Sequence, residues 1–223
     1  MNARQSVPLA PFLLRQAVFL LPLFLMVGIL KLTHGGSIAP MFSKLRLEYP
    51  ALAGGIKFFS TYGNAAFYCV YALLLLLSIL RRNGDGVRLV LAYILVQCTV
   101  TLIAVMLMKH TAGRPRPYTM EADWRFFTDN SSYHSLPSGH TAEIGAAAGP
   151  FAQRAKSIFI TLLWGLFPAA MGFSRLFRGM HHPADILVGA VIASLSCYCI
   201  LLLALRMRSI TRRIEPLRRW GLG

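Results

Sequence analysis

The chain has 223 residues, of which 56% are hydrophobic and only 14% are charged, and its mean hydropathy is +0.56. This composition excludes an ordinary soluble globular domain, whose surface needs more polar side chains than the sequence supplies. The net charge of +15 would suit a nucleic-acid-binding protein, but the basic residues lie at the ends of apolar runs, which is typical of membrane topology.

Five apolar segments meet or approach the length of roughly 20 residues that a helix needs to cross a bilayer. They are 12–32, 59–80, 89–108, 158–173 and 186–205. In the first, Arg4 and Arg15 precede the apolar stretch 17–30, as in a signal peptide, but no small-residue cleavage site follows, so we expect a span. The four cysteines lie inside apolar runs without metal-ligand spacing, which predicts small buried side chains.

The segment 139–151 is rich in Ala and Gly. It is too short and too mildly apolar to face lipid, yet it suits close packing against neighbouring helices. We therefore expect a sixth helix at the centre of the bundle. The sequence predicts an all-α polytopic membrane protein, with six transmembrane helices in a single domain over residues 1–223 and no obligate protein partner.

The basic residues are distributed unequally between the two sides of a six-span arrangement. One side would carry 13 of the 23 Lys and Arg residues, against only Asp85 and Glu215. The positive-inside rule makes this side cytoplasmic, together with both termini and the basic tail 206–223. The other side has two long connections, 33–58 and 110–136. The first mixes apolar and charged residues as an interfacial segment would, and a purely structural loop fits it equally well.

Three short polar stretches interrupt the apolar pattern, a placement that membrane proteins usually keep for function. They are Lys109–Pro117, Pro137–His140 and Ser174–Asp185. Six spans would bring all three to the outer face, whereas five would split them across the membrane. The chemistry of these stretches therefore favours the sixth span.

The residue types in these stretches predict an anion site. Lys109, Arg116 and Arg175 would bring together three positive charges, and guanidinium groups match phosphate oxygens with two parallel hydrogen bonds. Ser138 and Gly139 would add a hydroxyl and unpaired backbone N–H groups at a helix start, where phosphates bind in many folds.

Two histidines flank this anion site. Asp185 follows His181 by four residues, so on one helix face its carboxylate could hold one imidazole nitrogen and leave the other as a nucleophile. His140 would then be free to protonate a leaving oxygen.

In this order the three stretches resemble the three-part signature of the type 2 phosphatidic acid phosphatase superfamily, Lys-x6-Arg-Pro, Pro-Ser-Gly-His and Ser-Arg-x5-His-x3-Asp. The resemblance covers residues 109–185, and all fixed positions are present. It implies a membrane-embedded lipid phosphate phosphatase in which His181 becomes a phosphohistidine and His140 acts first as acid and then as base. It further implies that Lys109, Arg116, Ser138, Gly139 and Arg175 hold the phosphate, with no metal and no cofactor.

The resemblance leaves the substrate open among undecaprenyl diphosphate, phosphatidylglycerol phosphate, phosphatidate and the lipid A phosphates. A lipid-to-lipid phosphotransferase is the alternative function, whereas the complete signature argues against a non-catalytic protein. An outward-facing site favours a lipid in the outer leaflet of a bacterial inner membrane, with the active site facing the periplasm or exterior. We expect no nucleic-acid partner.

Three charged residues beside the signature are candidate substrate contacts. Arg114 and Arg178 would contact a second phosphate or a lipid headgroup, although solvated charges are the commoner case. Glu143 lies inside the sixth segment, where a carboxylate is a functional suspect. A structural bond to a nearby Ser, Thr or Arg is nevertheless the favoured interpretation for Glu143.

Overall fold

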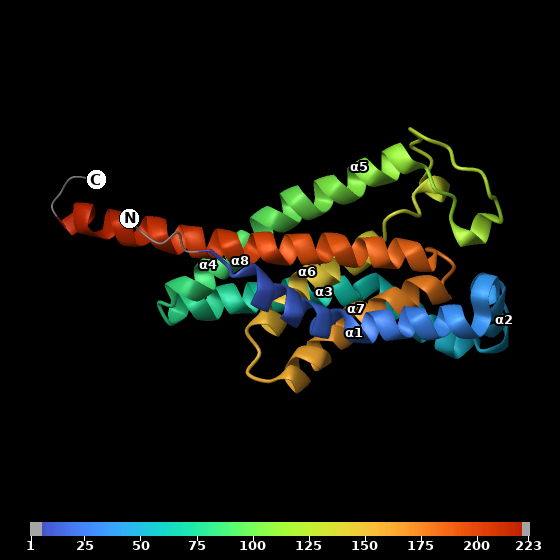
Figure 1. Ribbon diagram of the computed structural model, residues 1–223, viewed down its shortest axis with the longest axis horizontal. Helices are drawn as coiled ribbons and strands as arrows, with labels where there is room; N and C mark the ends of the chain where they lie inside the picture. Colours follow the sequence, from blue (N-terminus) through green and yellow to red (C-terminus); the bar gives the residue numbers. More distant parts are fainter. Residues whose placement is uncertain (1–5, 220–223) are drawn as a thin grey trace.

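The chain folds into a bundle of long helices (Figure 1). The computed structural model describes residues 6–219, which contain no β-strand, so the all-α prediction is confirmed for this part. The helices are α1 (Leu9–His34), α2 (Ile38–Glu48), α3 (Pro50–Leu80), α4 (Gly84–Val96), α5 (Leu102–Ala112), α6 (Gly139–Gln153), α7 (Ile158–Phe177) and α8 (Pro183–Arg219). Short 3-10 turns lie at Gly35–Ser37, Pro117–Thr119 and Ser131–Tyr133.

Five helical stretches of the described residues are long and apolar enough to cross a membrane, and they contain the five segments expected from hydropathy. They are Leu9–Glu48, Pro50–Leu80, Gly84–Thr119, Ile158–Phe177 and Pro183–Arg208. The third combines α4 and α5, which a π-helical turn at Gln97–Thr101 joins. Beyond that turn α5 leans away from the rest of the bundle (Figure 1).

Helix α6 has 15 residues and is shorter than these five stretches, but it forms the centre of the bundle. It packs against both α7 and α8. A Cβ atom on Gly145 would lie 2.7 Å from Cβ of Ala193, and one on Gly149 would lie 2.7 Å from Sγ of Cys197. Small residues on α6 therefore let the backbone of α8 approach closely, as the Ala and Gly content predicts.

The cysteines do not all follow their prediction. Cys197 is buried and Cys199 is partly buried, but Cys69 and Cys98 are exposed on the outside of the bundle. The prediction of four buried cysteines is therefore wrong for two of them, because an apolar run does not reveal which face of its helix is turned outward.

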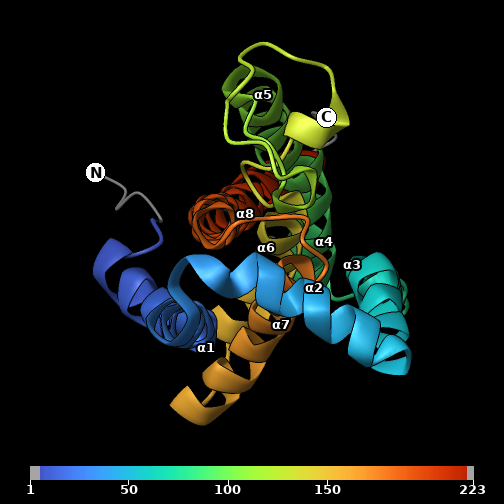
Figure 2. The ribbon, with the colours of Figure 1, turned by 90° about the vertical axis from the view of Figure 1, so that its right-hand side faces the viewer.

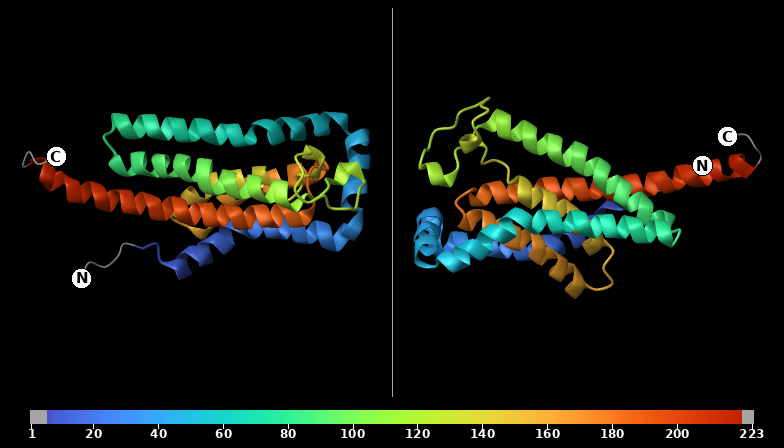
Figure 3. Two further views of the ribbon diagram at one scale, coloured as in Figure 1. Left: turned by 90° about the horizontal axis from the view of Figure 1, so that it is seen from above. Right: turned by 180° about the vertical axis from the view of Figure 1, so that it is seen from behind.

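The two ends of the bundle differ in what they carry. The start of α1, the α3–α4 and α6–α7 connections and the end of α8 lie toward one end (Figures 1 and 3). Helix α2, the segment 113–138 and the α7–α8 connection lie at the other end. The first end holds the basic connections at Arg81, Arg82 and Lys156, as the charge count predicts. Arg4 and residues 220–223 of the predicted basic tail lie outside the described residues.

The connection 33–58 is largely helical and is not the long loop expected from the sequence. Helix α2 lies across the ends of neighbouring helices (Figure 2). Its Phe42 packs against Phe173 and Phe177 of α7, with ring centroids 5.5 and 5.3 Å away. Arg46 of α2 also donates a hydrogen bond to the carbonyl of Phe177. Helix α2 therefore packs against the end of α7, where the third polar stretch begins.

Candidate active site

The three polar stretches meet at the end of the bundle that carries α2. Lys109 lies in the last turn of α5, and Arg116 follows in the next segment. Ser138 occupies the N-cap position of α6, and Arg175 lies in the last turn of α7. His181 lies in the short α7–α8 connection and Asp185 in the first turn of α8. The structure thus brings the predicted site residues together from four helices.

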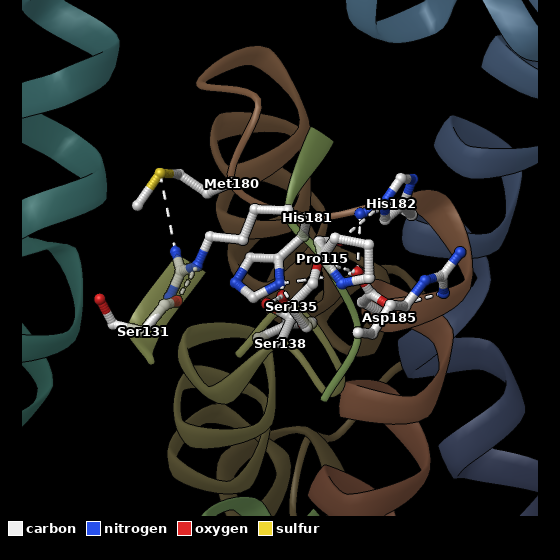
Figure 4. A network of polar contacts seen from close by, with 11 residues as sticks. Pro115, Ser131, Ser135, Ser138, Met180, His181, His182 and Asp185 are labelled. Atoms are coloured by element: carbon white, nitrogen blue, oxygen red, sulfur yellow. Dashed lines mark hydrogen bonds and ion pairs between the residues drawn. The ribbon is translucent and has the colours of Figure 1, made fainter. Parts of the chain in front are cut away.

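His181 is buried, and its ring is held by the backbone. Its Nδ1 lies 2.6 Å from the carbonyl oxygen of Ser135 (Figure 4). Because a carbonyl only accepts hydrogen bonds, Nδ1 carries the hydrogen and Nε2 keeps its lone pair. The pKa of His181 is lowered to about 4, chiefly by burial; Asp185 opposes this shift, and the positive charges of Arg175 and Arg116 contribute to it. The imidazole is therefore neutral at physiological pH, as a nucleophile must be.

Asp185 supports this histidine indirectly. Its Oδ2 is 3.8 Å from Nδ1 of His181, so the direct hydrogen bond expected from the four-residue spacing is not formed. Instead Oδ2 accepts hydrogen bonds from Oγ of Ser135 at 2.6 Å and from the N–H of His182 at 2.7 Å. Ser135 thus connects the carboxylate to the imidazole, with its hydroxyl on Asp185 and its carbonyl on His181 (Figure 4).

Arg114 is the second support of Asp185. Its Nη1 donates to Oδ1 of the carboxylate at 2.7 Å, and the Asp185 side chain is fully buried. Arg114, one of the candidate substrate contacts, thus neutralises this buried acid.

The three predicted phosphate-binding cations lie close enough to repel one another. The charge on Lys109 acts against those of Arg116 and Arg175. No carboxylate of the described residues lies within 4.0 Å of any of the three. Arg175 is only 5% exposed, and its Nε has no hydrogen-bond partner. Buried positive charge without a counterion is costly, so these side chains favour an anionic ligand.

The start of α6 lies beside the candidate phosphate-binding cations. Oγ of Ser138 lies 2.9 Å from Oγ1 of Thr141, and the N–H of Ser138 donates to the carbonyl of Asp185 at 3.0 Å. The Ser138 N–H is therefore already used. A Cβ atom on Gly139 would lie 3.1 Å from Cγ1 of Val105 and 3.6 Å from Nζ of Lys109. Glycine at this position lets the lysine approach the helix start.

A cavity of about 320 Å³ lies beside His140, between α3, the π-helical turn, α5 and α6. Glu143 lines it one turn after His140, and its Oε2 accepts a hydrogen bond of 2.5 Å from Nδ2 of Asn64. The favoured structural bond of Glu143 is thus present, but its partner is Asn64 on α3 and not a Ser, Thr or Arg. Asn64 also donates to the carbonyl of His140 at 3.4 Å, so it ties the two residues together.

Besides Asn64, two further residues of the site were not indicated by the sequence pattern. Ser60 on α3 accepts hydrogen bonds of 3.1 Å from Arg175 and from Arg178, and Ser135 precedes the Pro-Ser-Gly-His stretch. Neither lies at a fixed signature position. His182, beside the signature histidine, points its Nε2 at the carbonyl of Pro115 at 3.2 Å. Among the described residues, no group of three or more His, Cys, Asp or Glu side chains could hold a metal ion.

Five helical stretches long enough to cross a membrane, with a cluster of cations around a buried histidine, are typical of a multi-pass membrane protein with a candidate anion site. The chain belongs to the PAP2 superfamily, whose family model matches residues 85–209.

Curated proteins similar to this chain carry phosphatase names. A lipid A 1-phosphatase of Rhizobium johnstonii is 29% identical over 44% of this chain and 41% of its own length, and one of Rhizobium etli is 28% identical over 44% and 43%. The matched part thus spans about two-fifths of these two relatives. An undecaprenyl-diphosphatase of Sulfolobus acidocaldarius is 24% identical over 78% of this chain and 84% of its own length. No solved structure matches the chain.

Proposed function

We propose that this protein is an integral membrane phosphatase that hydrolyses a phosphomonoester or diphosphate of a lipid through a phosphohistidine at His181. The observation that carries the proposal is the free Nε2 of a buried, neutral His181 among cations without counterions. The names of the similar proteins support a lipid phosphate as the substrate class.

In the first step, Nε2 of His181 attacks phosphorus, and the bond from phosphorus to the lipid oxygen breaks. Lys109, Arg116 and Arg175 neutralise the charge that grows on the phosphoryl oxygens. His140 gives a proton to the departing lipid oxygen. Arg114 and Ser135 act as positioning residues, because they hold Asp185 and the His181 ring in place.

In the second step, His140 takes a proton from a water molecule, and the water oxygen attacks the phosphohistidine. The bond between phosphorus and Nε2 breaks, which releases inorganic phosphate and returns His181 to its neutral form. No step needs a metal ion, since the side-chain cations supply the positive charge.

Metal independence is therefore an expected result. Phosphate release by the purified protein should persist in EDTA, and vanadate should block it, because vanadate adopts the trigonal bipyramidal geometry of the transition state. Loss of activity in EDTA that magnesium restores would contradict the mechanism.

We further propose that the chain crosses the membrane six times, with both termini in the cytoplasm. Helix α6 runs from the site end toward the end that carries the α3–α4 connection, which supports six passes (Figure 1). Its 15 residues span only about 22 Å, but ten of them are buried, so protein covers most of its length. The site would then open on the outer face of a bacterial inner membrane, toward the periplasm or exterior.

Cysteine labelling tests this orientation. In a background without the four native cysteines, Asp123→Cys should react with a membrane-impermeant maleimide in intact spheroplasts, because Asp123 is exposed in the segment 113–138. Lys156→Cys, in the exposed α6–α7 connection, should react only after lysis. The reverse pattern would place the site in the cytoplasm.

A further inference from the structure

One hydroxyl lies between two guanidinium groups beside the site. Ser60 on α3 is fully buried, and its Oγ accepts a hydrogen bond of 3.1 Å from Nη1 of Arg175 and another of 3.1 Å from Nη1 of Arg178. The two arginines lie three residues apart at the end of α7, so they share one face of that helix. Ser60 therefore keeps two positively charged side chains close together.

This arrangement is electrostatically incomplete. The charges of Arg175 and Arg178 oppose each other, and a neutral serine offers dipoles but no counter-charge. No carboxylate of the described residues lies within 4.0 Å of either guanidinium. Arg178 also acts electrostatically on Arg116 and His140. The cluster thus contains one cation beyond the three that the transferred phosphoryl group needs.

The position of this extra cation indicates the shape of its ligand. Arg175 belongs to the phosphate-binding set, and Arg178 contacts the same oxygen atom as Arg175. An anion bound by Arg178 would therefore lie directly beside the phosphoryl group bound by Arg175. The two phosphorus atoms of a diphosphate share a bridging oxygen, so a diphosphate places two anionic groups side by side. The second acidic group of a larger headgroup would lie further away.

We propose that Ser60 and Arg178 form a subsite for the second phosphate of a lipid diphosphate, an inference that rests on the proposed phosphatase function for its substrate class. The terminal phosphoryl group moves to Nε2 of His181, and the bond between its phosphorus and the bridging oxygen breaks. The bonding electrons leave with the lipid monophosphate, whose oxygen takes the proton of His140. Arg178 stabilises the charge of this departing phosphate.

Matched substrates test the subsite in the purified, full-length protein. Farnesyl diphosphate and farnesyl phosphate share one chain and differ by one phosphate. In Arg178→Gln, the ratio of kcat/KM for the diphosphate to that for the monophosphate should fall roughly 10- to 100-fold, because one charge-assisted hydrogen bond is lost. Ser60→Ala should lower the ratio in the same direction, and Arg178→Lys should restore part of it.

Lys156→Gln is the matched control, since it removes one positive charge from an exposed position at the other end of the bundle. Its substrate ratio should equal that of the unmodified protein. A substrate ratio that stays unchanged in Arg178→Gln would overturn the subsite, whether the activity is retained or falls equally on both substrates.

A binding measurement separates this inference from the proposed function, because it needs no turnover. By calorimetry, inorganic pyrophosphate should bind the unmodified protein more tightly than inorganic phosphate does, and Arg178→Gln should remove most of that difference. If neither farnesyl compound is hydrolysed but the pyrophosphate preference depends on Arg178, the proposed hydrolysis fails for these lipids and the subsite stands. Equal affinity for the two anions in the unmodified protein would refute the subsite even if hydrolysis occurs.

Discussion

Replacing His181 by Ala should abolish phosphoenzyme formation and lower phosphate release by roughly 10⁴-fold or more, as the loss of a nucleophile does in other covalent mechanisms. The reason is geometric, since the Ser135 carbonyl holds Nδ1 and leaves Nε2 as the free nitrogen. The measurement is mass spectrometry of rapidly quenched protein, together with the rate of phosphate release.

His182 provides the matched control, because it is the same residue type one position away. Its ring contacts the Pro115 carbonyl, and its N–H holds Asp185 through the backbone, which any residue retains. The rate of phosphate release by His182→Ala should therefore fall by about 10-fold at most, which corresponds to one neutral hydrogen bond. If the phosphoenzyme still forms in His181→Ala, or is lost only in His182→Ala, then His181 is not the nucleophile.

Replacing His140 by Ala should have the second largest effect, about 10²- to 10⁴-fold on a lipid phosphate, which is the usual contribution of a general acid. A lipid alkoxide is a poor leaving group and needs the proton. The leaving group of an aryl phosphate such as p-nitrophenyl phosphate needs little protonation. The rate of phosphoryl transfer from this substrate should therefore fall far less in His140→Ala. The rates of phosphoenzyme formation with the two substrates give the comparison.

Asn64→Ala distinguishes an acid from a mere structural support. It removes the amide that holds Glu143 and the His140 backbone but leaves the imidazole in place. The decrease in the rate of this variant should therefore not depend on the leaving group. Equal losses of His140→Ala on good and poor leaving groups would remove His140 from the acid role.

Hydropathy was sufficient to predict the five long helical stretches, because a run of apolar residues near bilayer length has few alternatives to a helix. Helix α2 was missed, since Ile38–Glu48 mixes polar and apolar residues without the length of a span. The central position of α6 was predictable from its Ala and Gly residues, whose close contacts with α8 confirm the packing.

The site was predictable where residues follow a fixed spacing and unpredictable where contacts join distant parts of the chain. Spacing located His181, His140 and the three cations. It could not reveal Ser60 or Asn64, because each is a single polar residue in α3 whose partners lie more than 70 positions away. The spacing also suggested a direct bond between His181 and Asp185.

The three-dimensional structure inserts Ser135 between these two residues. A spacing of four places two side chains on one helix face, but His181 precedes the start of α8 and so does not follow helical geometry. The ion pair between Arg114 and Asp185 was likewise not predicted, because the spacing of residues does not show which cation a buried carboxylate pairs with.

The central claim is lipid phosphate hydrolysis at this site, and the most direct test is phosphate release by the purified protein in mixed micelles. The panel comprises a polyprenyl diphosphate, phosphatidylglycerol phosphate, phosphatidate and lipid A, each with and without a dephosphorylated lipid as acceptor. We predict inorganic phosphate from at least one of them, at a rate that His181→Ala abolishes. Recovery of the phosphoryl group only on the acceptor would indicate a phosphotransferase, and no release from any lipid would contradict the proposed function.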